Sequence, residues 1–529
     1  MTIVKIEEKE GIRVTAQPLV YGEKGDKFTR EDFTPQEWDS LKFKREDFNA
    51  DDIAMLKQPA IEAAENANTA TENANNATQN ANTATENANQ AAANANTLAP
   101  RVTALEDLAM SSAWYGVQWD LTNSNPAMTR IGNMLLHQSL PVQSKMRRCL
   151  LNTDGTINYY LHASDSTKKE DGTPAQLDGS DGDVMVEIPE YYYRVDTVGD
   201  LVKFIMSERP LAGFEKSEKC FISAYQATVK RDVLQLASVA NSTPNFRGGN
   251  NNAAWDNESR TLLGRPATAI SRTNGRTYAR NKGAGWEQLT YNAYKSLFWL
   301  YYVEYANRNS QASFISAPDN NGFKQGGLGA GVTDLNGSKW SSFNSQYPFV
   351  PCGHTNSLGN RTGVVGYTMP AEYDAAPFTT FVPSYRGIEN PFGHIYHWVD
   401  GVNIRVQAED AGGRSTVFIA HNQASFNDTS YAGHRDAGDQ SRINGYIKSL
   451  LLGRFADILT RENSGAGTTT YWTDYAYNSN IPPAGTSLRG LLVGGLATNG
   501  ATAGLACVHS YHAPSNTYAN IGLRLCFNP

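Results

Sequence analysis

The sequence lacks any long hydrophobic run. Its 529 residues contain no stretch that approaches the roughly eighteen apolar residues of a membrane-spanning helix. The N-terminal residues, MTIVKIEEKEG, also lack the apolar core of a signal peptide. A net charge of -7 argues against a nucleic-acid partner. We therefore expect a protein that is made in a cytoplasm, does not insert into membranes and does not bind nucleic acid.

Cysteine is scarce and scattered. The chain has five thiols, an odd number, and their wide spacing fits neither a CxxC metal site nor a dense disulfide framework. Because free cysteine behaves as a small apolar residue, we expect all of them to be buried thiols. They are Cys149, Cys220, Cys352, Cys507 and Cys526.

Familiar catalytic signatures are also missing. The chain has no GxSxG elbow, P-loop, HExxH helix or dinucleotide fingerprint. Two HxxH pairs occur, His394 with His397 and His509 with His512, but neither has a third ligand at a familiar metal spacing. Aromatic residues flank the first pair, so we expect it to be packed inside the protein. We predict no catalytic residue, no metal site and no cofactor.

Several carboxylates lie in predicted loops, and glycan-degrading enzymes work through paired carboxylates. The spacing of these residues does not separate a catalytic pair from solvated loop acids, so a hydrolase stays an alternative. The residues are Asp400, Glu409, Asp410, Asp436 and Asp439.

What the chain has instead is a long alanine repeat. Across residues 53–105 apolar side chains recur in alternating steps of three and four, and the string NANTATENAN begins at both Asn66 and Asn80. This heptad seam predicts a coiled coil of several chains over residues 59–110. At about 1.5 Å per residue, its central part would span roughly 60 Å.

The seam is a weak one. Each alanine buries a single methyl group, and burial yields only about 0.8 kcal/mol per CH₂. We therefore expect flanking folded parts to hold the chains in register, and alanine does not fix the number of strands. The alternative is a disordered linker, because residues 60–99 contain no aromatic residue, no lysine and no arginine.

Composition changes on both sides of the repeat. Residues 1–58 are too polar to bury much surface, so we expect them to order against a partner or another copy. Residues 111–213 alternate short strand patterns with turns, which predicts a small β-rich domain. Within it, Val184–Val195 predicts a strand. The string DGSDGD at Asp178 predicts a turn, with a structural calcium loop as the alternative.

Residues 214–529 form the largest expected domain. An opening strand is predicted at Phe221–Ala227, and the string ANIGLRLCF predicts a closing strand near the C-terminus. Between them, apolar residues at helical spacing over Leu289–Ala306 predict a core helix. The expected fold class is α+β.

In this order, these pieces resemble the C-type-lectin-like fold of the formylglycine-generating-enzyme type, over roughly residues 214–529. FISAYQAT matches the opening strand of that fold, and SLRGLLVGG with IGLRL matches its closing segment. The enzymes work through a close pair of cysteines, whereas Cys507 and Cys526 lie well apart in this sequence. The resemblance therefore implies the fold without the activity.

The C-terminal residues 488–526 resemble the variable region of proteins diversified by a retroelement, which ends some phage receptor-binding proteins. Such regions interleave variable positions with a framework of small and apolar residues. The resemblance implies as ligand-binding positions Leu492, Leu496, Thr498, Thr502, His509, Tyr511, His512 and Tyr518. The Pro/Ser/Asn-rich stretch around Tyr511 independently predicts a surface loop with exposed rings, and packing of these rings into the core is the alternative.

The segment YGEKGDKFTREDFTPQEWDSLKF resembles collagen-like segments of tail fibres from phages that infect Bacteroides. With the rod and the lectin-like tip, it implies a homotrimeric tail fibre of the virion, made in the host bacterial cytoplasm. Residues 1–58 would attach to a tail or baseplate protein, and the tip would bind a glycan or protein on the host cell. A fibre-borne glycan-degrading or formylglycine-generating-type enzyme and a bacterial adhesin stay as alternatives.

Overall fold

The computed structural model describes residues 2–8, 12–18, 58, 62, 65–66, 87–98, 112–370 and 377–529. The chain divides into two compact units, Met1–Asp107 and Leu108–Pro529. In the first unit, strands β1 (Thr2–Glu8) and β2 (Ile12–Pro18) pair antiparallel. Residues 87–98 are helical, as the alanine repeat predicts for this stretch. Most of the predicted rod and attachment segment lies outside the described residues, and association of several chains stays a prediction.

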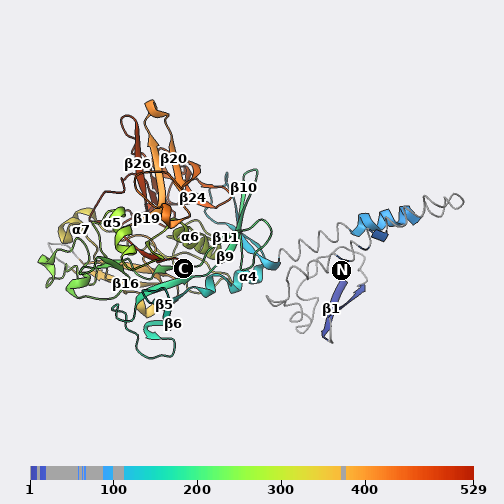
Figure 1. Ribbon diagram of the computed structural model, residues 1–529, viewed down its shortest axis with the longest axis horizontal. Coiled ribbons are helices and arrows are strands. Elements are labelled where there is room, and N and C mark those ends of the chain that lie inside the picture. The colour runs from blue at the N-terminus through green and yellow to red at the C-terminus, as the bar shows by residue number, and fades with distance from the viewer. Residues whose placement is uncertain are drawn as a thin grey trace. The chain divides into compact units, whose positions relative to one another are not determined.

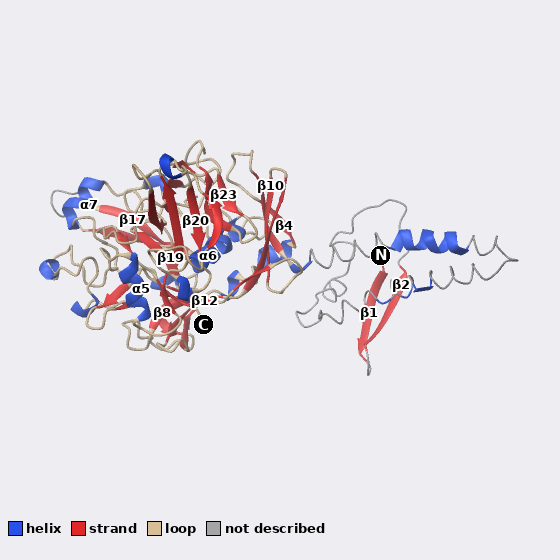
Figure 2. Cartoon of the chain, turned by 45° about the horizontal axis from the view of Figure 1, so that its top comes forward, coloured by secondary structure: helices blue, strands red, loops and turns tan. Residues whose placement is uncertain are grey.

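The second unit is a mixed α+β structure in which strands predominate (Figure 2). Its largest sheet has the order β21-β20-β19-β26-β27-β25-β22, and β28 pairs with β19. The β25–β27 and β19–β28 pairs are parallel, whereas the other neighbours with a register are antiparallel. The strands are β19 (Tyr396–Gln407), β20 (Ser415–Ile419), β21 (Arg435–Asp439), β22 (Gly445–Tyr446), β25 (Tyr475–Tyr477), β26 (Thr486–Val493), β27 (Val508–His509) and β28 (Ile521–Gly522). Figure 1 shows β19, β20 and β26 together in orange and red.

Two further sheets complete the main framework. A five-stranded sheet has the order β11-β9-β10-β3-β4, and a seven-stranded sheet has the order β15-β29-β12-β8-β5-β6-β7. The first contains β3 (Tyr115–Asp120), β4 (Thr129–Gly132), β9 (Tyr191–Val198), β10 (Leu201–Ser207) and β11 (Glu215–Ser217). The second contains β5 (Arg147–Leu151), β6 (Ile157–His162), β7 (Asp165–Lys169), β8 (Asp183–Ile188), β12 (Cys220–Ser223), β15 (Trp286–Gln288) and β29 (Leu525–Phe527).

The remaining elements are short. The small sheets are formed by β13 (Thr228–Lys230), β14 (Gln235–Ala237), β16 (Gly363–Met369), β17 (Phe378–Tyr385), β18 (Ile388–Glu389), β23 (Ser449–Leu452) and β24 (Asp457–Glu462). The α-helices of this unit are α4 (Met134–Ser139), α5 (Arg272–Arg280), α6 (Tyr291–Tyr305) and α7 (Gly337–Asn344). The 3₁₀ turns are η3 (Gln143–Lys145), η4 (Pro244–Phe246), η5 (Ala253–Trp255), η6 (Asn356–Leu358), η7 (Glu409–Ala411), η8 (Gln423–Ser425) and η9 (Gly500–Thr502). None of the helices in the described ranges has both the length and the apolar character needed to cross a lipid bilayer.

Helix α6 confirms the predicted core helix. The Thr290 side chain caps its N-terminus by accepting the N–H of Ala293, and Ala306 ends it in the left-handed conformation. The helix contacts β19, β12 and β3, which belong to the three largest sheets. Apolar side chains on all of its faces are therefore buried, as expected for a helix surrounded by protein. Trp299 stacks on Phe204 of β10 with ring centroids 4.1 Å apart.

The sheets continue across residue 213, where the sequence predicts a boundary between two domains. Strand β11 pairs with β9, and β12 pairs with β8, so segments from either side of residue 213 share both sheets. Residues 111–213 therefore do not form a sheet system of their own. The segment Val184–Val195, which the sequence predicts as one strand, is divided between β8 and β9. Pro189 lies between them and lacks the N–H that a continuous ladder needs.

The opening and closing strands lie side by side. Strand β12 pairs with β29, so the predicted opening strand is confirmed, although it ends at Ser223. The predicted closing strand is divided into β28 and β29, and Arg524 between them is buried. Its guanidinium donates to the carbonyl oxygens of Ser223 and Asn390, at 3.1 and 2.6 Å. A buried charge that must reach these carbonyls explains the interruption.

Candidate binding surface

Three neighbouring strands of the largest sheet place aromatic rings in a row. Residues two apart on a strand point to the same face, so Tyr475 and Tyr477 lie on one side of β25 while Ala476 is buried on the other. Tyr446 of β22 is opposite Tyr475, and His509 of β27 is opposite Tyr477. Successive ring centroids are 5.1, 4.7 and 5.2 Å apart from Tyr446 through Tyr475 and Tyr477 to His509.

The loop after β27 extends this row. His509 and His512 stack nearly parallel, with centroids 4.8 Å apart and an interplanar angle of 6°. Tyr511 packs against both histidines, and the ring centroids of Tyr518 and His512 are 4.8 Å apart. Tyr511 and Tyr518 are 43% and 45% exposed. We call the continuous set of rings the aromatic strip, and it comprises Tyr446, Tyr475, Tyr477, His509, Tyr511, His512 and Tyr518.

Buried polar groups fix the backbone that leads into the strip. The Asp474 carboxylate accepts the N–H of Ala506 at 2.8 Å, and burial raises its pKa well above the usual range. Gly504 has a φ of 146°, and a Cβ there would lie 2.2 Å from the Asp474 carboxylate. The Tyr294 hydroxyl of α6 donates to the carbonyl of Leu505 at 2.7 Å. The strip therefore starts from a rigid support, which suits a binding surface.

The predicted ligand-binding positions separate into two groups. His509, Tyr511, His512 and Tyr518 lie together in the aromatic strip. Thr502 lies at the edge of the strip, with its hydroxyl 3.2 Å from that of Tyr477, and Thr498 is exposed in a turn.

Leu492 and Leu496 are buried, with exposed fractions of 0% and 8%. They belong to the core and not to the surface. Leu492 is flanked by Trp398 of β19 and His509 of β27, and apolar side chains cover both faces of the sheet there. Neither leucine can contact a ligand at the surface, so the prediction for these two positions is wrong.

The sequence did not single out Tyr446, Tyr475 and Tyr477. Two of them form the pattern YAY, whose alternation places both rings on one face of a strand and was the available signal. Their contact with His509 depends on parallel pairing between β25 and β27. Nothing in the sequence indicates that pairing.

The aromatic strip is nearly free of charge at neutral pH. Burial, with a smaller contribution from the neighbouring His512, lowers the pKa of His509 to about 3. The pKa of His512 is also lowered, by burial and then by the positive charge of Arg489. Burial raises the pKa of the Tyr477 hydroxyl to about 12. Both imidazoles are therefore neutral, and the strip presents faces and edges of uncharged rings.

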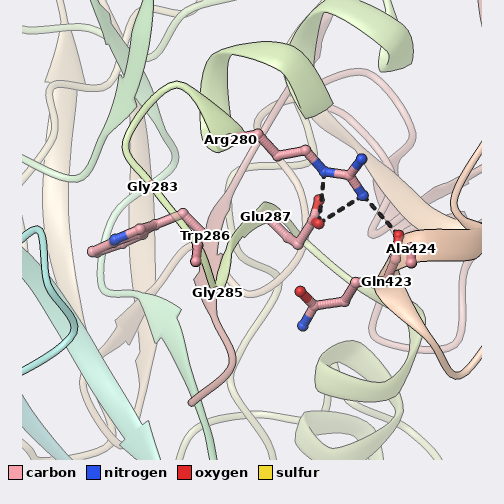
Figure 3. Close-up of a pocket in the computed structure, with 8 residues that line it drawn as sticks. Arg280, Gly283, Gly285, Trp286, Glu287, Gln423 and Ala424 are labelled. Carbon is pink, nitrogen blue, oxygen red and sulfur yellow. Dashed lines mark hydrogen bonds and ion pairs between the residues drawn. The ribbon is translucent and has the colours of Figure 1, made fainter.

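A second feature of this unit is a hollow of about 420 Å³ beside α5 and β15. Arg280 donates to one oxygen of Glu287 and to the backbone carbonyl of Gln423, each at 2.8 Å. Figure 3 shows the Glu287 carboxyl group between Arg280 and the Gln423 side chain. The second oxygen, Oε2 of Glu287, is buried without a hydrogen-bond partner among the described residues. Burial raises the pKa of Glu287 to about 7, although Arg280 opposes this shift.

Glu287 should make stability depend on pH. Its folded pKa of about 7 exceeds the unfolded value of about 4.3, so the unfolded chain binds fewer protons between these values. The contribution of this group is fully present below the unfolded pKa and is lost as pH rises through about 7. The free energy of unfolding of Glu287→Gln should therefore rise relative to that of wild type as pH increases from about 5 to about 8, by up to about 3 kcal/mol.

Thermal unfolding of the full chain across this pH range measures the effect. Glu218→Gln is the matched control, because the side chain of Glu218 is 74% exposed. The loss of this exposed ion pair should change the free energy of unfolding by less than about 1 kcal/mol. A constant difference for Glu287→Gln would contradict the assignment of the raised pKa.

The carboxylates predicted to lie in loops differ in burial, and three of them lie in strands, Asp400 in β19 and Asp436 and Asp439 in β21. Asp400 is fully buried and accepts both hydrogen bonds of the Arg276 guanidinium fork, at 2.6 and 2.8 Å. The other four, by contrast, are exposed, namely Glu409, Asp410, Asp436 and Asp439. Within the described ranges, no three His, Cys, Asp or Glu side chains are arranged as metal ligands would be.

His394 and His397 are packed inside the protein, as predicted. Gln226 links them, with its amide oxygen 2.6 Å from Nδ1 of His394 and its amide nitrogen 2.8 Å from Nε2 of His397. The N–H of Phe349 donates to Nε2 of His394 at 3.1 Å. Burial lowers the pKa of His394 to about 3. The prediction of five buried free thiols is likewise confirmed.

Known protein families and curated proteins were compared with this chain, and neither comparison finds a match. The aromatic strip and the Glu287 hollow are therefore the features on which a functional conclusion rests.

Proposed function

We propose that this chain is the receptor-binding protein of a phage tail fibre, and that its aromatic strip attaches the virion to a molecule on the host cell surface. The observation that carries this proposal is the strip itself. Its rings contact one another across three strands and a loop, and Tyr511 and Tyr518 are nearly half exposed. Exposed aromatic side chains that rest on a row of packed rings are typical of interaction surfaces.

Two physical properties favour binding by the strip. Tyrosine and histidine rings give large contact areas with few rotatable bonds, so little conformational entropy is lost when they bind. The backbone below them is held in place before binding by Asp474 and by the Tyr294 hydroxyl. Preorganisation lowers the free-energy cost of association.

The remaining parts of the chain would form the fibre that carries the strip. Copies associate along the alanine seam as a homotrimer, residues 1–58 attach to a tail or baseplate protein, and each tip presents one strip. Several strips on one virion convert weak individual contacts into avidity. Retroelement diversification would act on the surface positions Thr498, Thr502, Tyr511 and Tyr518, where a changed side chain leaves the core intact.

Competition for adsorption tests this function. Purified full-length chain, added in excess to host bacteria, should block adsorption of the phage that encodes it. A fibre from an unrelated phage is the control and should leave adsorption unchanged. Undiminished adsorption at saturating concentrations of the chain would reject the proposal.

The Glu287 hollow favours a second candidate, a glycan-degrading enzyme carried on the fibre. A carboxyl group with a pKa of about 7 suits proton transfer near neutral pH. Glycosidases use a second carboxylate as well. The negative charge of Asp400 contributes to the raised pKa of Glu287, but the Asp400 carboxylate already accepts hydrogen bonds from Arg276. Release of reducing ends from host capsule, abolished by Glu287→Gln, would establish this activity. An absence of product would leave binding as the function of the chain.

A further inference from the structure

The two most exposed rings of the aromatic strip both contact one imidazole. The ring centroids of Tyr511 and His512 are 5.3 Å apart, and those of His512 and Tyr518 are 4.8 Å apart. The two tyrosine planes are inclined to the imidazole plane by 70° and 47°, so neither ring is stacked face to face on it. Because both tyrosines share this neighbour, one short ligand can contact both of them.

The polar side chains that bond the strip are uncharged. The Asn499 amide donates to the Tyr477 hydroxyl at 3.2 Å, and the Thr502 hydroxyl is 3.2 Å from the same oxygen. The Asn480 amide donates to the carbonyl of Tyr511 at 2.6 Å. Amides and hydroxyl groups each offer both a hydrogen-bond donor and an acceptor. The edge of the strip therefore suits a ligand that is rich in hydroxyl groups, which have the same dual character.

Charged side chains do not contact the rings of the strip. Within the described ranges, the cation–π contacts and the ion pairs involve other residues. Lys448, which lies near β22, is paired with Glu462 at 3.1 Å. The surface around the exposed tyrosines therefore offers hydrogen bonds and ring faces but no ionic contact.

Arg489 lies on the other face of the sheet. In the register of β26, Leu492 is opposite His509, whereas Arg489 is opposite Ile404 of β19. Opposite residues share a face, and residues an odd number of positions apart on a strand point to opposite faces. The Arg489 side chain is therefore not part of the strip.

We propose that the aromatic strip binds a neutral oligosaccharide, with sugar rings on Tyr511 and Tyr518 and a sugar hydroxyl group bonded by Asn480. This inference rests on the proposed function, because it names the chemical class of the receptor that the strip would recognise. The negative face of an aromatic ring attracts the positively polarised C–H groups on one face of a sugar. A neutral sugar brings no charge that must be desolvated without a partner, so an uncharged surface is sufficient to bind it.

The absence of an ionic contact disfavours two other classes of ligand. Single-stranded nucleic acids also stack on aromatic rows, but their binding sites follow the phosphate backbone with a positively charged groove. A polyanionic glycan would likewise gain from charge-assisted hydrogen bonds to arginine or lysine. The net charge of -7 on the chain would also repel both kinds of polyanion.

Binding of the full-length chain to host polysaccharide tests the inference. The probe is polysaccharide extracted from cells to which the chain adsorbs, in native, carboxyl-reduced, desulfated, dephosphorylated and periodate-oxidised forms. The dissociation constant for the native form should change less than about twofold between about 50 and about 500 mM salt, because no charge pair forms. Removal of anionic groups should leave binding unchanged, whereas periodate, which opens sugar rings at vicinal hydroxyl groups, should abolish it. Weaker binding after removal of an anionic group, or unchanged binding after periodate, would overturn the inference.

Two variants of Tyr518 test whether an aromatic face is required. Tyr518→Phe keeps the ring, and Tyr518→Leu keeps an apolar side chain without a ring face. The leucine variant should bind the native polysaccharide about fivefold to tenfold more weakly than the phenylalanine variant. Tyr518 is 45% exposed, so neither change disturbs the core. Phe381→Leu, at a site that is 56% exposed on β17, is the matched control and should bind as wild type does. Equal binding by the two Tyr518 variants would contradict stacking of a sugar on this ring.

Failure of the inference and failure of the proposed function are distinguishable. If the chain adsorbs to cells but protease treatment of the cells abolishes adsorption, the receptor is a protein, and the glycan inference is wrong while the attachment function stands. If the chain does not compete with the phage for any host cell, the attachment function itself is wrong.

Discussion

Replacing Tyr511 and Tyr518 together with alanine should weaken the binding of the full-length chain to its host cells by about a hundredfold. Exposed rings at the centre of an interface each contribute on the order of 2 kcal/mol, and neighbouring contributions are not additive. Tyr511 and Tyr518 are 43% and 45% exposed, so their removal leaves the core intact. Binding of labelled chain to host cells measures the loss.

Phe381→Ala is the matched control for this experiment. Phe381 is 56% exposed on β17, which belongs to a different sheet from the aromatic strip. This variant should bind cells as wild type does, and circular dichroism should show all proteins folded. Wild-type affinity in the double variant, or an equal loss in Phe381→Ala, would exclude the strip as the attachment surface.

The second large effect concerns stability. Replacing Arg276 by methionine should lower the free energy of unfolding by about 3–5 kcal/mol, because it leaves a buried carboxylate without its cation. Asp400 is fully buried and bonds the Arg276 guanidinium at 2.6 and 2.8 Å. Arg276 also bonds Asp428, and its charge helps to keep the pKa of that carboxyl low. Urea unfolding of the full chain measures the change.

Arg414→Met provides the comparison at an exposed ion pair. Arg414 bonds Asp439 at 2.7 Å, but the two side chains are 56% and 38% exposed. Exposed pairs contribute less than about 1 kcal/mol, so this variant should unfold almost as wild type does. Equal decreases in the free energy of unfolding from both substitutions would show that burial does not determine how much the Arg276 ion pair contributes to stability.

Local patterns predicted the elements that depend on local chemistry. Helix α6 follows from apolar residues at helical spacing over Leu289–Ala306, and the structure buries it in the core as that spacing predicts. The exposed rings of Tyr511 and Tyr518 follow from a polar loop that interrupts strand patterns. The buried thiols follow from the apolar character of cysteine.

Long-range pairing explains what the sequence did not reveal. The strand at Tyr475–Tyr477 joins the aromatic strip only because it pairs in parallel with Val508–His509, and no local pattern specifies that partner. The expected boundary near residue 213 is likewise crossed by pairing of β12 with β8.

Leu492 and Leu496 show the limit of the family resemblance. Their predicted role came from alternation with framework residues, which matches the spacing of variable positions. The structure places Leu492 between Trp398 and His509 on a sheet whose two faces are both covered by apolar side chains. Alternation on such a strand does not separate surface from core.

Hydrogen exchange of the full-length chain, with and without host surface polysaccharide, tests the central claim most directly. If the aromatic strip is the attachment surface, binding should slow exchange of backbone amides in residues 475–480 and 508–520 and leave residues 283–287 at the Glu287 hollow unchanged. Protection at the hollow without protection along the strip would contradict the account.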